Sequence, residues 1–204
     1  MRAAGGVFIA DEVQASFGPM GSHMWGFQRH GLVPDIVTLG KPMGNGHPMA
    51  GMVCRSQLLR EFGERCRYFN TFGGNPVSAN VGMAVLDVIE WEGLQEAAGR
   101  VGRYLKAGLA RLAERRELIG DIRGEGLFVG IELVHGRASR TPAPTETTRI
   151  VNAMRERVLI GAAGIVGNVL KVRPPLPFSE AHADIFLAKL DEVLAEGVSD
   201  RVES

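Results

Sequence analysis

The chain has 204 residues, of which 45% are hydrophobic and 23% charged, and its 23 basic side chains balance its 23 acidic ones. This composition is typical of a globular protein and excludes an intrinsically disordered chain. A net charge of zero gives no indication of the excess positive charge that binds nucleic acid or an anionic membrane surface.

The first part of the chain carries two short apolar runs that end in charged residues. Residues 7–10 are apolar and lead into Asp11, and residues 36–39 are mostly apolar and lead through Gly40 into Lys41. Unalternating apolar runs bounded by turn residues are typical of parallel strands that are covered on both faces. Because ligands bind at the carboxyl ends of the strands of an open α/β sheet, we expect Asp11 and Lys41 at that edge.

Helical periodicity begins at Pro76. Apolar residues recur at helical spacing over residues 77–89, which predicts an amphipathic helix. A second apolar stripe over residues 94–112, with arginine and glutamate opposite, predicts a longer helix that stops near Ile119.

The last third of the chain predicts a small α+β unit. Apolar and polar residues alternate over 127–134 and again over 168–173, which is the period of a strand. Helical spacing predicts one helix between these strands and a last helix capped by Ser179. We therefore divide the chain into a partial large α/β domain, residues 1–115, and a small α+β domain, residues 116–204.

Targeting and metal-binding signals are missing from the sequence. No stretch approaches the roughly 20 apolar residues that span a bilayer, and the apolar run near the N-terminus is too short for a signal peptide. Cys54 and Cys66 have no C-x-x-C spacing, and the five histidines have no metal-ligand spacing. We expect a cytoplasmic protein with reduced thiols, no metal, and neither membrane nor nucleic acid as a partner.

Lys41 and Asp11 are the strongest candidates for chemistry. Lys41 lies among glycines, where a ligand can approach, and a lysine in a low-dielectric pocket becomes an amine nucleophile toward a carbonyl. A buried Asp11 needs a cationic partner, which a pyridinium nitrogen supplies in enzymes that pair a Schiff-base lysine with an aspartate. The alternatives are a lysine on a solvated surface and a strand-end aspartate that caps a turn.

Three motifs make the chain resemble the class III aminotransferases, which are pyridoxal-phosphate enzymes of fold type I. The motifs are IADEVQ at 9–14, PDIVTLGK at 34–41 and NTFGGNP at 70–76, in matching order and spacing. The resemblance covers essentially the whole chain. It implies an α/β fold, namely the C-terminal part of a fold type I subunit, with a mostly parallel sheet in a partial large domain and a small α+β domain. The family's first half is not represented, so we expect a truncated chain.

The resemblance implies pyridoxal 5'-phosphate as the cofactor and roles for the residues that match the motifs. Lys41 is implied to form the Schiff base with the cofactor and to shuttle the substrate proton, while Asp11 pairs with the pyridinium nitrogen. Val13 is implied to pack on a ring face, and Gln14 to hydrogen-bond near the phenolic oxygen. Thr71 is implied to hold the cofactor phosphate of the neighbouring subunit, which makes the site a property of a homodimer.

The resemblance also bears on the substrate, a small amine or amino acid. Arg173 matches an arginine that often binds a substrate carboxylate in this family, with a surface arginine on a strand as the alternative. Residues 40–48, 69–78 and 140–143 resemble the phospho-lyase branch, which eliminates phosphate from phosphorylated amines. His47 is then a candidate contact for substrate phosphate, with a loop histidine that binds no ligand as the alternative.

These observations leave three functions to compare. The first is pyridoxal-phosphate-dependent amino-group transfer through the Lys41 Schiff base. The second is elimination of phosphate and ammonia from a phosphorylated amine. The third is a non-catalytic fragment that only dimerises or binds a partner. It is motivated by the unrepresented first half, which in the family supplies the aromatic residue stacked on the cofactor ring and the glycine-rich turn around the phosphate.

Overall fold

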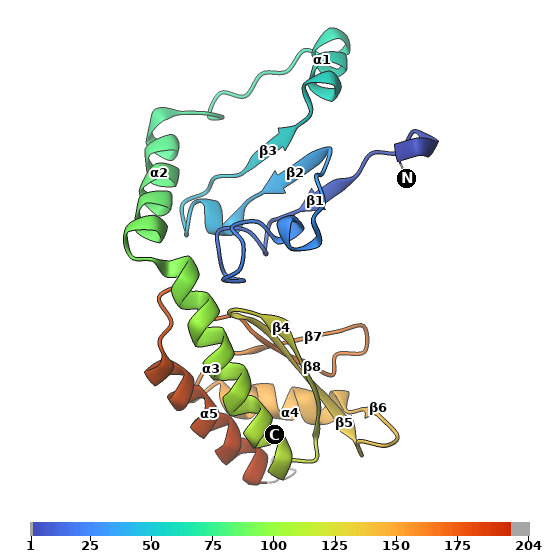
Figure 1. The fold of residues 1–204 in the computed structure, drawn as a ribbon, viewed down its shortest axis with the longest axis vertical. Helices are drawn as coiled ribbons and strands as arrows, with labels where there is room; N and C mark the ends of the chain where they lie inside the picture. Colours follow the sequence, from blue (N-terminus) through green and yellow to red (C-terminus); the bar gives the residue numbers. More distant parts are fainter. Residues whose placement is uncertain (1, 197–204) are drawn as a thin grey trace, which may run out of the picture. The chain divides into compact units, whose positions relative to one another are not determined.

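A computed structural model describes residues 2–196, and these fall into two compact units that divide between Gln95 and Glu96 (Figure 1). The sequence-based division after residue 115 lies at the other end of helix α3 (Leu94–Arg115). The structure groups most of α3 with the second unit because the apolar stripe of this helix lies in the core of that unit.

The first unit contains a three-stranded sheet in the order β1–β2–β3. Strands β1 (Ile9–Asp11) and β2 (Ile36–Leu39) run parallel, as the sequence predicts. Strand β3 (Gly51–Cys54) pairs antiparallel with β2 and is not among the predicted elements. The carboxyl ends of β1 and β2 therefore lie at one edge of the sheet, which is the edge expected to bind a ligand.

Five helices complete the described part of the first unit. Three 3₁₀ helices and two α-helices, α1 and α2, cover Arg2–Ala4, Gly26–His30, Lys41–Met43, Ser56–Arg65 and Pro76–Trp91 in that order. The predicted start of α2 is confirmed, because the Asn75 side chain accepts the Ser78 N–H at 2.9 Å and Pro76 occupies the first turn. Of the residues of α2, Ile89 is the one that is buried; in the predicted apolar stripe Val81 and Val85 are half-buried, and the other three members are exposed.

The second unit is built on an antiparallel sheet in the order β4–β5–β8–β7, with β6 paired to β5. The strands β4 to β8 are Ile119–Glu125, Phe128–His135, Thr141–Pro142, Gly161–Ala163 and Val169–Val172. The predicted alternation in β5 is confirmed, because Val129, Ile131 and Leu133 are all buried. These side chains share one core with residues of α3, α4 (Pro144–Met154) and α5 (Glu180–Ala195), so the helices cover this face of the sheet.

The start of α5 is also as predicted. The Ser179 hydroxyl accepts the His182 N–H at 3.3 Å, and the His182 ring accepts the Ser179 N–H at 3.2 Å in return. Such reciprocal capping satisfies two backbone donors at the helix N-terminus. Among residues 2–196, the structure contains no helix that is long and apolar enough to cross a membrane.

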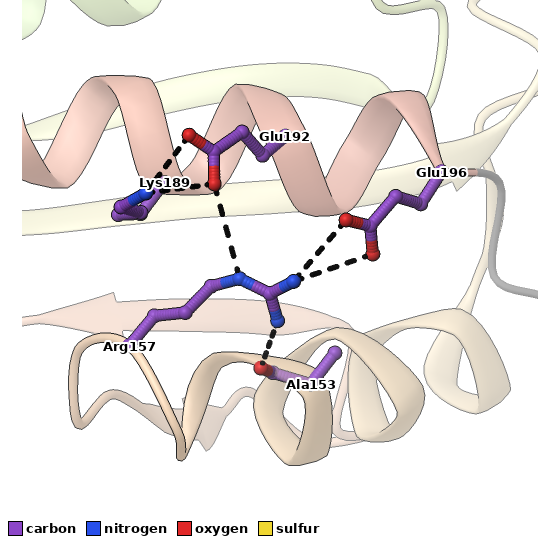
Figure 2. A network of polar contacts seen from close by, with 5 residues as sticks. All are labelled: Ala153, Arg157, Lys189, Glu192 and Glu196. Carbon is purple, nitrogen blue, oxygen red and sulfur yellow. Dashed lines mark hydrogen bonds and ion pairs between the residues drawn. The ribbon is translucent and has the colours of Figure 1, made fainter.

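A polar network links the segment after α4 to α5 (Figure 2). Arg157 donates to the Ala153 carbonyl at 2.8 Å and to the Glu196 carboxylate at 3.1 Å, and its Nε lies 4.0 Å from Glu192. Lys189 pairs with Glu192 at 2.9 Å. Exposed ion pairs contribute about 0–1 kcal/mol each, so the apolar core stabilises this unit more than the network does.

Candidate functional site

Asp11 is the last residue of β1, and one oxygen of its carboxylate accepts two hydrogen bonds. Oδ1 accepts the Val13 N–H at 3.2 Å and the Thr38 hydroxyl at 3.3 Å. Thr38 is the residue opposite Asp11 in the parallel register of β1 and β2. The side chain of Asp11 is exposed, and its Oδ2 accepts no hydrogen bond from residues 2–196. Asp11 is therefore an oriented carboxylate with one oxygen open to a ligand.

Lys41 lies two residues beyond β2, at the edge of the sheet that carries Asp11. The residue is exposed and has a φ of +28°, in the left-handed region that lysine rarely adopts. Pro42 follows directly, and a residue before proline ordinarily adopts extended backbone. Strained backbone of this kind concentrates at functional sites. The adjacent parallel strands thus bring the predicted aspartate and lysine to one edge.

Val13 and Gln14 lie in the turn after β1. A Cβ placed on Gly40 would be 3.5 Å from Cγ1 of Val13, so the Val13 side chain lies beside the backbone that leads into Lys41. Gln14 is exposed. Four of the predicted site residues therefore lie at the carboxyl end of β1 or in the segments that follow β1 and β2.

Glu12 is a buried carboxylate next to Asp11 that the sequence analysis does not identify. Its side chain accepts the Gly26 N–H at 2.8 Å and the Phe27 N–H at 2.7 Å, and the residue is 3% exposed. Its own N–H donates to the Thr38 carbonyl at 3.0 Å. Glu12 thus ties the turn after β1 to the 3₁₀ helix at 26–30 and to β2, and so fixes the backbone beside Asp11.

Thr71 lies in an exposed stretch between α1 and α2, and its side chain makes no hydrogen bond within the described part of the chain. Neighbouring residues of this stretch, including Asn70 and Phe72, line a cavity of about 980 Å³ together with His47. The His47 Nε2 lies 2.8 Å from the Ser78 hydroxyl. The structure therefore gives His47 a protein partner and leaves Thr71 outside the group around Asp11.

Arg173 follows β8 in the second unit, whereas the other predicted site residues belong to the first. Its guanidinium carbon lies 4.4 Å from the centroid of the Phe128 ring, which is a cation–π contact. Burial lowers the pKa of Arg173 below its usual range. Arg173 also lines a cavity of about 790 Å³ with apolar side chains such as Phe178 and Ile185. A guanidinium in such surroundings is suited to bind a carboxylate or a phosphate.

The site can be compared with known proteins at this point. The family model described as "Aminotransferase class-III" matches residues 2–194. The chain belongs to the class III aminotransferases. The prediction of this family and of its α/β fold is confirmed.

Two curated relatives in this family are alanine–glyoxylate aminotransferases 2 by name. Over 192 residues the chain is 50% identical to alanine–glyoxylate aminotransferase 2 homolog 2, mitochondrial, of Arabidopsis thaliana. This alignment covers 94% of this chain and 40% of the relative. The chain is 46% identical to the alanine–glyoxylate aminotransferase 2-like protein of Drosophila melanogaster, over 100% of this chain and 42% of the relative. The chain therefore spans about two fifths of the length of these relatives.

Two similar solved structures are of proteins that are named for different activities. A phospholyase from Arthrobacter, solved in complex with phosphoethanolamine, is 49% identical with a TM-score of 0.91, over 95% of this chain and 46% of that one. A transaminase from the marine bacterium Virgibacillus is 27% identical with a TM-score of 0.88, over 96% of this chain and 46% of that one. The predicted resemblance to the phospho-lyase branch is thus matched by a solved structure.

The residues present fit the cofactor of this family. A pyridinium N–H needs an ionised acceptor, and Asp11 presents Oδ2 without a partner among residues 2–196. A covalently held cofactor needs a primary amine, and Lys41 supplies it from the adjacent strand end. In the same described range, no group of three or more His, Cys, Asp or Glu side chains is placed to hold a metal ion.

Proposed function

We propose that the protein to which this chain contributes is a pyridoxal-phosphate-dependent enzyme that transfers an amino group and holds its cofactor on Lys41. The observation that carries the proposal is the oriented Asp11 carboxylate and Lys41 at the carboxyl ends of two adjacent parallel strands. The cofactor, when bound, supplies an electron sink for negative charge at the substrate Cα. Asp11 Oδ2 accepts the ring N–H and keeps the nitrogen protonated, while Lys41 Nζ carries the proton to and from the substrate.

The other predicted roles enter the proposal on the same basis. Val13, beside Gly40, packs on a face of the ring, and Gln14 hydrogen-bonds near the phenolic oxygen. Thr71 binds the cofactor phosphate of a neighbouring subunit in a homodimer, and its exposed segment supports that role. Arg173 binds the anionic group of a small amine or amino-acid substrate. The cytoplasmic location stays a prediction, and the name of the Arabidopsis relative includes the word mitochondrial.

A second candidate is elimination of phosphate and ammonia from a phosphorylated amine. The observation that supports it is the 49% identity to the Arthrobacter phospholyase, which is nearly the 50% identity to the Arabidopsis aminotransferase. Both reactions need the same lysine and aspartate, and elimination needs in addition a site for the leaving phosphate. His47, beside the cavity of the first unit, is the candidate for that contact.

Reductive trapping tests the proposal. The 204-residue chain incubated with pyridoxal phosphate should gain an absorbance band at the edge of the visible range that borohydride removes, with the adduct mapped by mass spectrometry to Lys41. Lys41→Ala should lose the adduct, and Lys189→Ala, which removes a half-buried helix lysine of the second unit, should keep it. A reducible adduct in Lys41→Ala would refute the assignment, and the absence of any adduct in the wild type would favour the non-catalytic fragment.

A phosphate assay separates the two reactions. Elimination releases inorganic phosphate and ammonia from phosphoethanolamine without a keto acid, whereas transfer consumes an amino donor and a keto acid together. Phosphate release in the absence of an acceptor would identify a lyase. Turnover that depends on the keto acid, with no release of phosphate, would identify an aminotransferase.

A further inference from the structure

We propose that Thr38 is a positioning residue whose hydroxyl fixes the Asp11 carboxylate, so that one oxygen is held by the protein and the other is presented to the cofactor. This inference rests on the proposed function, because that function gives Asp11 its pyridinium partner. Neither Thr38 nor its hydroxyl is part of the roles proposed above.

The register of the sheet places the two residues together. Thr38 is the parallel-register partner of Asp11, and its Oγ1 lies 3.3 Å from Asp11 Oδ1. An ionised carboxylate can only accept hydrogen bonds, so the hydroxyl is the donor. The Val13 N–H donates to the same oxygen at 3.2 Å. One donor comes from the neighbouring strand and the other from the turn after β1, and together they restrict rotation of the carboxylate.

The hydroxyl is not required by the strand itself. Thr38 is half-buried in a strand whose other members are Ile36, Val37 and Leu39, and valine would satisfy the same β-branched preference. Within residues 2–196 the hydroxyl has Asp11 as its one hydrogen-bond partner. Among the described residues, the hydroxyl of Thr38 therefore bonds to Asp11 alone.

Loss of the hydroxyl should weaken cofactor binding. In Thr38→Val, Oδ1 keeps only the Val13 N–H, and the carboxylate can turn away from the orientation that leaves Oδ2 open. A single hydrogen bond to a carboxylate, at the long end of the distance range, corresponds to a rise in the cofactor dissociation constant of roughly threefold to tenfold. Thr38→Ser keeps the hydroxyl and should bind the cofactor as the wild type does.

The test is a titration of pyridoxal phosphate against the 204-residue chain, followed by absorbance, for the wild type, Thr38→Val and Thr38→Ser. Thr148→Val is the matched control, because it removes a hydroxyl that donates to the Pro144 carbonyl in the second unit and should leave the dissociation constant unchanged. Asp11→Asn and the double variant Asp11→Asn/Thr38→Val complete a double-mutant cycle. If Thr38 acts through Asp11, Thr38→Val should have no further effect when Asp11 is already replaced.

The outcomes distinguish this inference from the function on which it rests. A wild type that forms no borohydride-reducible adduct on Lys41 would overturn the proposed function, and the role of Thr38 with it. A wild type that forms the adduct, with Thr38→Val binding the cofactor equally well, would overturn the role of Thr38 alone. An equal loss in the Asp11→Asn background would show that Thr38 acts through the strand, not through Asp11. If Thr38→Val does not fold, Thr38→Ser and Thr38→Ala give the same comparison, since they differ only in the hydroxyl.

Discussion

Replacing Glu12 with glutamine should destabilise the first unit, although the two side chains have nearly the same shape. Each carboxylate oxygen of Glu12 accepts one backbone N–H, from Gly26 at 2.8 Å and from Phe27 at 2.7 Å, and the residue is 3% exposed. A glutamine amide can accept only one of these bonds, because its NH₂ group faces the second N–H donor to donor. The variant therefore loses a charge-assisted hydrogen bond and leaves a buried N–H unsatisfied, which costs about 1.5–3 kcal/mol.

Tryptophan fluorescence can measure this loss in the first unit alone. Both tryptophans of the chain, Trp25 and Trp91, belong to that unit, and Trp25 packs edge-on against Phe17 in the loop that Glu12 holds. Urea unfolding followed at these residues should give the predicted decrease in the free energy of unfolding for Glu12→Gln. Glu61→Gln, in the exposed helix α1, is the matched control and should stay within about 0.5 kcal/mol of the wild type. If both variants unfold like the wild type, the buried carboxylate does not hold the loop.

Three further changes should have measurable effects. The Phe8 N–H first, and then Arg2, hold the pKa of Asp35 below its ordinary value of 3.8, so the stability that this group provides is present above that value and lost as the pH falls through the folded pKa. In Asp35→Asn, the free energy of unfolding followed by fluorescence should therefore fall less steeply as the pH is lowered below that value. A fall as steep as in the wild type would contradict this. Leu109→Ala removes a fully buried side chain from the core of the second unit and should lower the free energy of unfolding by about 2–5 kcal/mol, measured by circular dichroism in urea. A decrease below about 1 kcal/mol would contradict close packing around Leu109. Ser179→Ala removes the α5 cap and should cost about 1 kcal/mol, with Ser139→Ala as a control expected to change less.

Local patterns explain which parts of the fold could be predicted from the sequence. The alternation in β5 and the apolar stripe of α3 are set by residues a few positions apart, so their periods appear in the sequence itself. Strand β3, Gly51–Cys54, is not predicted by the sequence. That strand exists through its pairing with β2, which no local pattern encodes.

The same distinction applies to the site. Asp11 and Lys41 could be predicted because each stands at the end of an apolar run, where α/β sheets bind ligands. Glu12 and Thr38 could not, because their roles depend on partners that are distant in sequence. The carboxylate of Glu12 is buried against a helix 14 and 15 residues further on, and the hydroxyl of Thr38 reaches a residue 27 positions earlier.

The contacts that orient Asp11 do not distinguish the two proposed reactions from each other. They come from the register of β1 with β2 and from the turn after β1, and both contacts lie within the first unit. A carboxylate held in this way is preorganised for a cationic ring before any substrate is present. Under the proposed function, amino-group transfer and phosphate elimination would both use this arrangement, so Asp11 and Lys41 do not decide between them. The residues that decide must be those that meet the anionic group of the substrate, for which His47 and Arg173 are the candidates in this chain.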